Sequence, residues 1–151
     1  PHPSTPVASF CSGLVEVPDP ARFERIFVVT PDDIDELDHV NNVVYLRWVQ
    51  EVAIAHWRNA ATSEQIVDIL WVAIRHEIDY EAPAFLGDQI TARTWVERWT
   101  RTTSERHTEI IRDLDRTVLA RARTIWAAID PDSQRPRRLG KGIAERFMAH
   151  D

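Results

Sequence analysis

"NVVYLRWVQEVAIAHWRN", residues 42–59, is the stretch that decides the fold. On a helix with about 3.6 residues per turn, its polar side chains form one stripe and apolar side chains cover the rest. The stripe consists of Arg47, Gln50, Glu51 and Arg58. A helix that is apolar on most sides is buried on most sides. The pattern therefore predicts a central helix from Asn42 to about Asn59 that other elements surround.

Segments on both sides of this helix carry the alternation of half-buried strands. Strands are expected at residues 22–30, 70–80, 88–100, 103–112 and 117–130. In the second of these, the alternation places four apolar side chains on one face, namely Val72, Ile74, Ile78 and Tyr80. One strand, one long helix and then four strands predict an α+β fold in which an antiparallel sheet curls around the helix.

The two ends of the chain look different from this middle. Residues 1–20 hold five of the nine prolines and are expected to form a loose N-terminal arm. Residues 21–151 are expected to form one domain, because a chain of 151 residues fits a single core. Residues 142–150 could form a short terminal helix.

Composition excludes several classes of protein. A formal net charge of −6 is unsuited to a nucleic-acid partner. One cysteine allows no intrachain disulfide, and the six histidines show no close ligand spacing, so neither a metal nor a cofactor is expected. No apolar run reaches the roughly 18 residues of a membrane span, and no basic region precedes an apolar one at the N-terminus. A cytoplasmic location is the expectation.

The stretch before the helix, "TPDDIDELDHV" (residues 30–40), packs five acids into seven positions. One interpretation is helix capping, because acids are favoured near a helix N-terminus and Asn41 or Asn42 would be a good N-cap. However, five acids exceed what one cap needs. The N-terminus of a buried helix also offers free N–H groups to an oxyanion or a polarised carbonyl. A carboxylate beside such a point makes a minimal hydrolytic site.

"DDIDELDHVNNVVYLRWVQE", residues 32–51, resembles the signature of the hotdog-fold acyl-CoA thioesterases, the 4-hydroxybenzoyl-CoA thioesterase-like family and its acyl-ACP relatives. The matching residues are Asp33, Asp35, His39, Val40, Asn41, Asn42, Tyr45, Leu46 and Trp48. "IDYEAPAFLGDQI", residues 78–90, resembles the second strand and proline turn of the family. The resemblance covers about residues 21–138 and implies the hotdog fold. Two positions depart from the pattern: Asp38 replaces a glycine and Gln50 replaces an acid.

The resemblance also implies residue roles. Asp35 would be the catalytic carboxylate, as nucleophile or as general base. The backbone N–H of Asn42, with that of Val43, would hold the carbonyl oxygen. His39 would be an acid–base partner or a structural turn residue. Asn41 and Tyr45 would shape the substrate site.

Arginines are the expected handle for coenzyme A phosphates. The candidates are Arg98, Arg101 and Arg106 around a strand turn, and the tail "RPRR", residues 135–138. The resemblance implies an acyl-CoA or acyl-ACP substrate and a homodimer or homotetramer with the acyl pocket between subunits. Two alternatives stay open: a hotdog protein that binds acyl-CoA or acyl carrier protein without turnover, and a hotdog dehydratase. The His-x-Phe-Pro-Gly context of the dehydratase is absent from the sequence.

Overall fold

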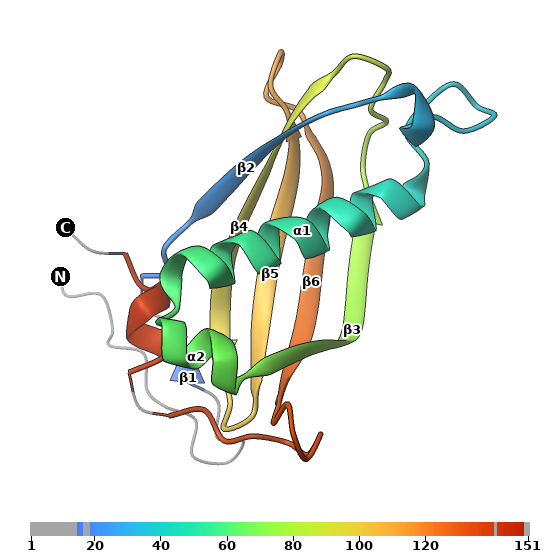
Figure 1. Cartoon of the computed structure of the whole chain (residues 1–151). Coiled ribbons are helices and arrows are strands. Elements are labelled where there is room, and N and C mark those ends of the chain that lie inside the picture. Colours follow the sequence, from blue (N-terminus) through green and yellow to red (C-terminus); the bar gives the residue numbers. More distant parts are fainter. Residues whose placement is uncertain (1–14, 17–18, 141, 150–151) are drawn as a thin grey trace, which may run out of the picture.

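A long helix, α1 (Asn42–Ala60), crosses one face of an antiparallel sheet (Figure 1). The computed structural model describes residues 15–16, 19–140 and 142–149. The other elements are β1 (Val15–Glu16), β2 (Phe23–Val28), η1 (Pro31–Asp33), α2 (Ser63–Asp68), β3 (Leu70–Tyr80), β4 (Gln89–Trp99), β5 (Thr103–Arg112), β6 (Val118–Ile129) and η2 (Ala144–Phe147). The expected α+β architecture of one sheet around one helix is confirmed. None of the described helices is both long and apolar enough to cross a membrane.

The strands follow the order β1-β4-β5-β6-β3, and β2 also pairs with β4. All pairs are antiparallel, as in Thr94 opposite Thr108 and Thr108 opposite Ala122. The hairpins β4–β5–β6 form the centre, whereas β3 reaches the sheet from the far end of α1 and pairs with β6. Among the described strands, β3 therefore keeps one unpaired edge.

The core lies between α1 and the centre of the sheet. Trp48, Val49 and Val52 of α1 are at most 1% exposed and pack in one cluster with apolar side chains of the strands. Burying side chains of this size contributes roughly 1.5–3 kcal/mol each. The predicted helix is confirmed and ends one residue later than expected. Its polar stripe is also confirmed, because Arg47 and Arg58 remain exposed.

One prediction about β3 is wrong. Val72 and Ile74 do not share a face with Ile78, because the register against β6 shifts between Ala73 and Arg75. A bulge of one residue reverses which side chains face inward. Ile78 packs against the core, whereas Ile74 is 60% exposed.

Three elements were not expected from the sequence, namely α2, β1 and the 3-10 helix η1. The first begins with a capping box in which Thr62 Oγ1 accepts from Gln65 N at 3.1 Å and Gln65 Oε1 accepts from Thr62 N at 2.9 Å. The expected N-terminal arm, residues 1–20, lies mostly outside the described residues, but its described part includes β1, which pairs with β4. The expected terminal helix is the short 3-10 helix η2.

Candidate active site

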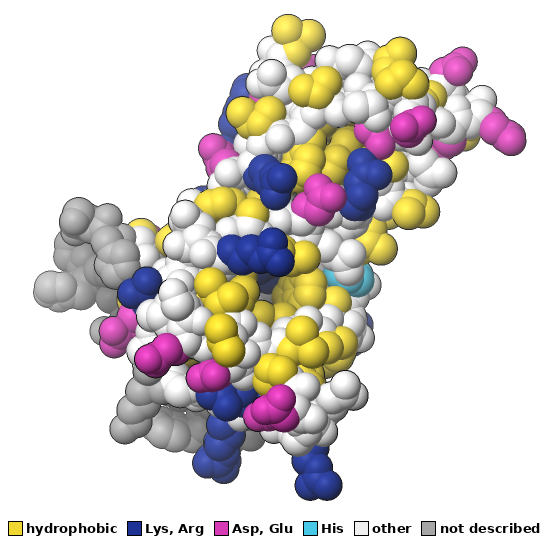
Figure 2. All heavy atoms as spheres, viewed as in Figure 1, with side chains coloured by type: hydrophobic (Ala, Val, Ile, Leu, Met, Phe, Trp, Pro, Cys, Tyr) yellow, Lys and Arg dark blue, Asp and Glu magenta, His cyan; other side chains and the backbone are white. Residues whose placement is uncertain are grey.

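The loop between η1 and α1 is a miniature hairpin that ends in the cap of α1. Ile34 and Val40 form a β-bridge, Asp35 N donates to His39 O at 3.0 Å, and Asp38 N donates to Asp35 O at 3.1 Å. Asp38 has a φ of 61°, so this aspartate adopts the left-handed conformation that the family's glycine would adopt freely. The loop protrudes past the N-terminus of α1, and Asp and Glu side chains gather at that end (Figures 1 and 2).

Asn41 is the N-cap of α1, which confirms one of the two predicted caps. Its Oδ1 accepts a hydrogen bond from Val43 N at 3.0 Å, and its carbonyl accepts from Val44 N at 2.9 Å. No described residue accepts from the N–H of Asn42. Because the first N–H groups of a helix have no intrahelical acceptor, Asn42 N–H remains as the donor at this terminus.

A cavity of about 220 Å³ opens at this helix end. It is lined by His39, Val40, Asn42, Tyr45, Tyr80, Glu81, Ala82 and Pro83. The structure thus brings together His39, Asn42 and Tyr45 of the predicted residues. Tyr80 and Pro83 were not predicted to line the site, although both lie in the segment that resembles the family's proline turn.

Asp35 lies beside this cavity and does not itself line it. Its Oδ1 accepts from Leu37 N at 2.8 Å and lies 3.9 Å from His39 Nδ1. Both side chains are partly exposed, with about 27% and 32% of their surface accessible. Of the two side chains, His39 lines the cavity and Asp35 lies next to His39.

Asp33 differs from the other acids of the loop, because it is buried. Its Oδ2 accepts from Thr30 N at 2.9 Å, and its Oδ1 accepts from Arg47 Nη2 at 2.9 Å. Burial opposes its ionisation, but the hydrogen bonds from Thr30 and Arg47 outweigh that effect and hold the pKa of Asp33 below its ordinary value. Arg47 also approaches Glu51 within 4.0 Å, as their helical spacing predicts. Asp33 thus fixes the loop to α1.

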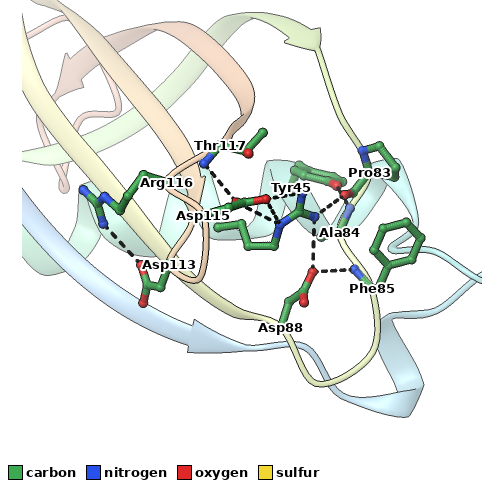
Figure 3. A network of polar contacts seen from close by, with 10 residues as sticks. Tyr45, Pro83, Ala84, Phe85, Asp88, Asp113, Asp115, Arg116 and Thr117 are labelled. Carbon is green, nitrogen blue, oxygen red and sulfur yellow. Dashed lines mark hydrogen bonds and ion pairs between the residues drawn. The ribbon is translucent and has the colours of Figure 1, made fainter.

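A network around Arg112 holds the loop that forms the far wall of the cavity (Figure 3). Arg112 Nη1 donates to Pro83 O at 2.9 Å and lies 3.5 Å from Asp88 Oδ2, and its Nε donates to Asp115. On the other side, Ala84 N donates to the Tyr45 hydroxyl at 3.0 Å. Burial raises the pKa of Tyr45, so its phenol stays neutral. The network ties residues 82–88 both to α1 and to the β5–β6 turn.

The three candidate phosphate arginines are not gathered in one place. Arg101 is exposed on the turn between β4 and β5. Arg98 is half-buried, with Nη1 3.2 Å from Glu105 Oε2. Arg106 is only 5% exposed and lies on the face of the sheet that is covered by α1, where it contacts His56. Arg106 does not fit the expected surface role, because its strand turns that position toward α1. In the tail, Arg137 lies 4.0 Å from Asp68.

A metal centre does not appear among the residues described. No group of three His, Cys, Asp or Glu side chains there could hold an ion. The chemistry available at the end of α1 is a backbone N–H, a histidine and a carboxylate. Such a set suits polarisation of a carbonyl and activation of water or direct attack.

Comparisons with known proteins place the chain in a family. The sequence matches the thioesterase-like superfamily over residues 29–147. A comparison with curated proteins finds no match.

Solved structures share the fold at low identity. A 1,4-dihydroxy-2-naphthoyl-CoA thioesterase from Synechocystis aligns with a TM-score of 0.73 and 19% identity, over 84% of this chain and 96% of that one. The probable thioesterase YbaW from Escherichia coli aligns at 0.74 and 21%, over 84% and 99%. A 12:0-ACP thioesterase from Umbellularia californica aligns at 0.73 and 15%, over 85% of this chain and 51% of that one. The predicted hotdog fold is confirmed.

Proposed function

The chain belongs to the thioesterase-like superfamily and is a thioester hydrolase, and on that premise we propose that its substrate is an acyl-CoA or acyl-ACP thioester cleaved at the N-terminus of α1. The observation that carries the proposal is the cavity at this terminus, which is lined by Asn42 and His39 and has the Asp35 carboxylate beside it. The names of two solved relatives, one acting on a CoA thioester and one on an ACP thioester, support the substrate class.

In the proposed reaction, the thioester carbonyl oxygen accepts a hydrogen bond from Asn42 N–H. The partial positive charge of the helix terminus stabilises the negative charge that develops on this oxygen. Val43 N–H, the second expected donor, is engaged by Asn41 Oδ1. Asn42 N–H is therefore the principal donor, and the Asn41 side chain keeps the helix terminus in shape.

Asp35 is the proposed carboxylate. As a nucleophile it attacks the carbonyl carbon and displaces the thiolate of the carrier, and water then hydrolyses the anhydride formed on Asp35 to release the acid. As a general base it takes a proton from the attacking water while the thiolate leaves, and this proton then passes to the thiolate or to solvent. His39, 3.9 Å from Asp35, positions the carboxylate or relays its proton. Arg101 and Arg98, around the β4–β5 turn, are the remaining candidates to meet the phosphates of a carrier.

The proposed active unit is a homodimer, or a homotetramer built from it, with the acyl pocket between copies. The unpaired edge of β3 supports this assembly, because an open sheet edge favours pairing with another chain. Tyr80, at the end of β3, lines the cavity, so pairing at that edge would place the partner near the site.

The direct test is hydrolysis of a panel of acyl-CoA and acyl-ACP thioesters, followed with a thiol reagent. Asp35→Asn should lower kcat by about 10²–10⁴-fold, the usual range for one acid–base group. Its folding should be unchanged, because the Asn side-chain oxygen can still accept from Leu37 N. Asp38→Asn, which removes one charge from the same loop, is the matched control and should keep activity within about tenfold, near 1.4 kcal/mol in barrier.

Two outcomes would contradict the proposal. If Asp35→Asn hydrolysed the thioesters at the wild-type rate, the acidic loop would serve only to cap α1. Binding of the thioesters without release of thiol, at every chain length tried, would identify a non-catalytic acyl carrier binder.

A further inference from the structure

A second cavity lies at the other end of α1 from the candidate active site. It has a volume of about 270 Å³ and is bounded by the second half of α1, α2 and the facing strands. In Figure 2 it is visible as a hollow among hydrophobic side chains, with Lys or Arg side chains at its rim. Its size is near the lower end of the range of roughly 300–1,000 Å³ that is usual for small-molecule sites.

The charged wall of this cavity is Arg106, which is 5% exposed. Its hydrogen bonds to described residues both leave from Nη1, to His56 Nδ1 at 2.8 Å and to Thr94 Oγ1 at 3.2 Å. Because a guanidinium only donates, His56 Nδ1 is the acceptor and the imidazole is neutral. Burial and the neighbouring Arg106 lower the pKa of His56 to about 3, in agreement with that state. The N–H groups of Nε and Nη2 remain for a ligand.

No described carboxylate compensates this charge. The described residues that line the cavity include no Asp or Glu, whereas they include a second arginine, Arg58. Burial lowers the pKa of Arg106 to about 9, which still leaves the guanidinium charged at neutral pH. Buried charges in proteins are normally paired, because an unpaired charge is costly to remove from water. Arg106 therefore gives this cavity a positive charge that no described carboxylate neutralises, which favours an anionic ligand.

Tryptophans supply much of the apolar surface of this cavity. Trp71, Trp99 and Trp126 all line it, and each has a buried indole Nε1 without an acceptor among the described residues. An indole N–H can only donate. These three N–H groups are themselves buried, so the tryptophans offer the cavity the apolar surface of their rings beside the charge of Arg106.

We propose that this cavity is a binding site for a small carboxylate with an aromatic or apolar body, whose carboxylate pairs with Arg106. Planar bidentate pairing of a guanidinium with a carboxylate is strong and directional. The apolar body fits a lining that includes Trp57, Ile66 and Ile69.

The site is distinct from the candidate active site and does not rest on the proposed function. Asn42 lines the cavity at the candidate active site, and Ala53 lines the second cavity. They are eleven residues apart on α1, about 16 Å along the helix axis. Between them, Trp48, Val49 and Val52 are fully packed in the core. The two cavities share no lining residue.

The test uses phenylacetate as the probe, with phenylacetamide as its neutral isostere and acetate as the acid without an apolar body. Each is titrated into the wild-type chain while the tryptophan indole N–H resonances are followed by ¹H–¹⁵N NMR. We expect saturable shifts of the Trp99 and Trp126 indole signals with phenylacetate. Phenylacetamide and acetate should each bind at least about tenfold more weakly, because each lacks one half of the recognition.

Substitutions of Arg106 test whether this side chain binds the carboxylate of phenylacetate. Arg106→Met should weaken phenylacetate binding at least about tenfold, and Arg106→Lys should recover part of the loss, since a lysine keeps the charge but not the planar fork. Arg25→Met removes one exposed arginine outside the cavity and should leave binding unchanged. Equal affinity for the acid and the amide in the wild type would overturn the proposal, and so would full affinity in a folded Arg106→Met. If Arg106→Met does not fold, the acid–amide comparison decides.

Discussion

Asp33 is the one buried acid of the loop before α1, and its charge is held by Thr30 and Arg47. We expect Asp33→Asn to lower the free energy of unfolding by about 1–2 kcal/mol at neutral pH, allowing for the half-exposed Arg47. The folded-state pKa of Asp33 is lowered from 3.8, so the stability that its charge contributes is present above 3.8 and is lost as the pH falls through the folded value.

Urea denaturation at neutral pH and at about pH 3 tests this linkage. The difference between wild type and Asp33→Asn should shrink on the acid side, because the unfolded wild-type chain takes up a proton there more readily than the folded chain, whose Asp33 pKa is lowered. Asp32→Asn, an exposed neighbour, is the control with little effect. A difference that is constant over this range would show that the charge of Asp33 is not what stabilises the loop.

Asp38 holds a left-handed conformation at a φ of 61°, which a residue with a Cβ adopts at a cost. Asp38→Gly should therefore raise the free energy of unfolding by about 0.5–1 kcal/mol, and turnover should equal or exceed that of the wild type. Leu37→Gly, in the same turn but outside the left-handed region, should destabilise the chain. Thermal melts and thiol-release assays measure both effects; a less stable Asp38→Gly would contradict the strain argument.

At single positions, the sequence predicts local chemistry better than side-chain direction. The cap at Asn41 and the tolerance of Asp38 for the turn follow from residue type alone, and both are observed. The inward direction of Arg106 could not be predicted, because β5 is polar on both faces and its alternation gives no preferred side. The contact of His56 with Arg106 was likewise not predictable, because His56 lies in a helix that is apolar on most sides.

At the scale of elements, a hydrogen bond from Ala84 N to the Tyr45 hydroxyl joins residues 82–88 to α1. Tyr45→Phe removes the acceptor of the buried Ala84 N–H, so we expect it to lower the free energy of unfolding by about 1–3 kcal/mol. Tyr80→Phe is the matched control. Its hydroxyl donates to Asn42 O at 3.3 Å from a partly exposed position where water can replace it, so the loss should be under about 0.5 kcal/mol.

Chemical denaturation of the two variants measures this difference. Equal losses in the two phenylalanine variants would show that the Ala84 hydrogen bond has no special weight. If the prediction holds, proteolysis should also cut residues 82–88 faster in Tyr45→Phe, because the wall of the cavity loses its hydrogen bond to Tyr45 of α1.

Element boundaries were predictable where turn or helix-breaking residues separate the elements, as at Gly87 and Pro131. The bounds of α1, β3 and β5 agree with the sequence to within one residue. The bulge in β3 was not predictable, because an inserted residue leaves the composition of the strand unchanged while it reverses the faces. The short helix α2 could have been found from the Thr62–Gln65 capping box, a spacing with a known physical cause.

At the scale of the whole molecule, the sheet ends at β3, and no described strand pairs with the outer edge of β3. Val72 and Ile74 are exposed in the first half of this strand, whereas its exposed charged residues, Arg75, Glu77 and Asp79, follow in the second half. An apolar segment on an open edge favours pairing with another strand. We therefore expect the wild type to scatter light as a dimer or tetramer at micromolar concentration, with at least twice the chain mass of 17.4 kDa.

Val72→Lys/Ile74→Lys tests whether β3 is the contact. Two lysines on this edge should weaken association and shift the scattering mass toward that of one chain, because like charges would meet across the paired strands. Val67→Lys/Leu114→Lys adds the same charge at exposed apolar positions on α2 and the β5–β6 turn, and should leave the mass unchanged. A wild-type monomer would contradict the assembly and the proposed pocket between copies. A dimer that resists the β3 lysines but yields to the others would move the contact to another surface.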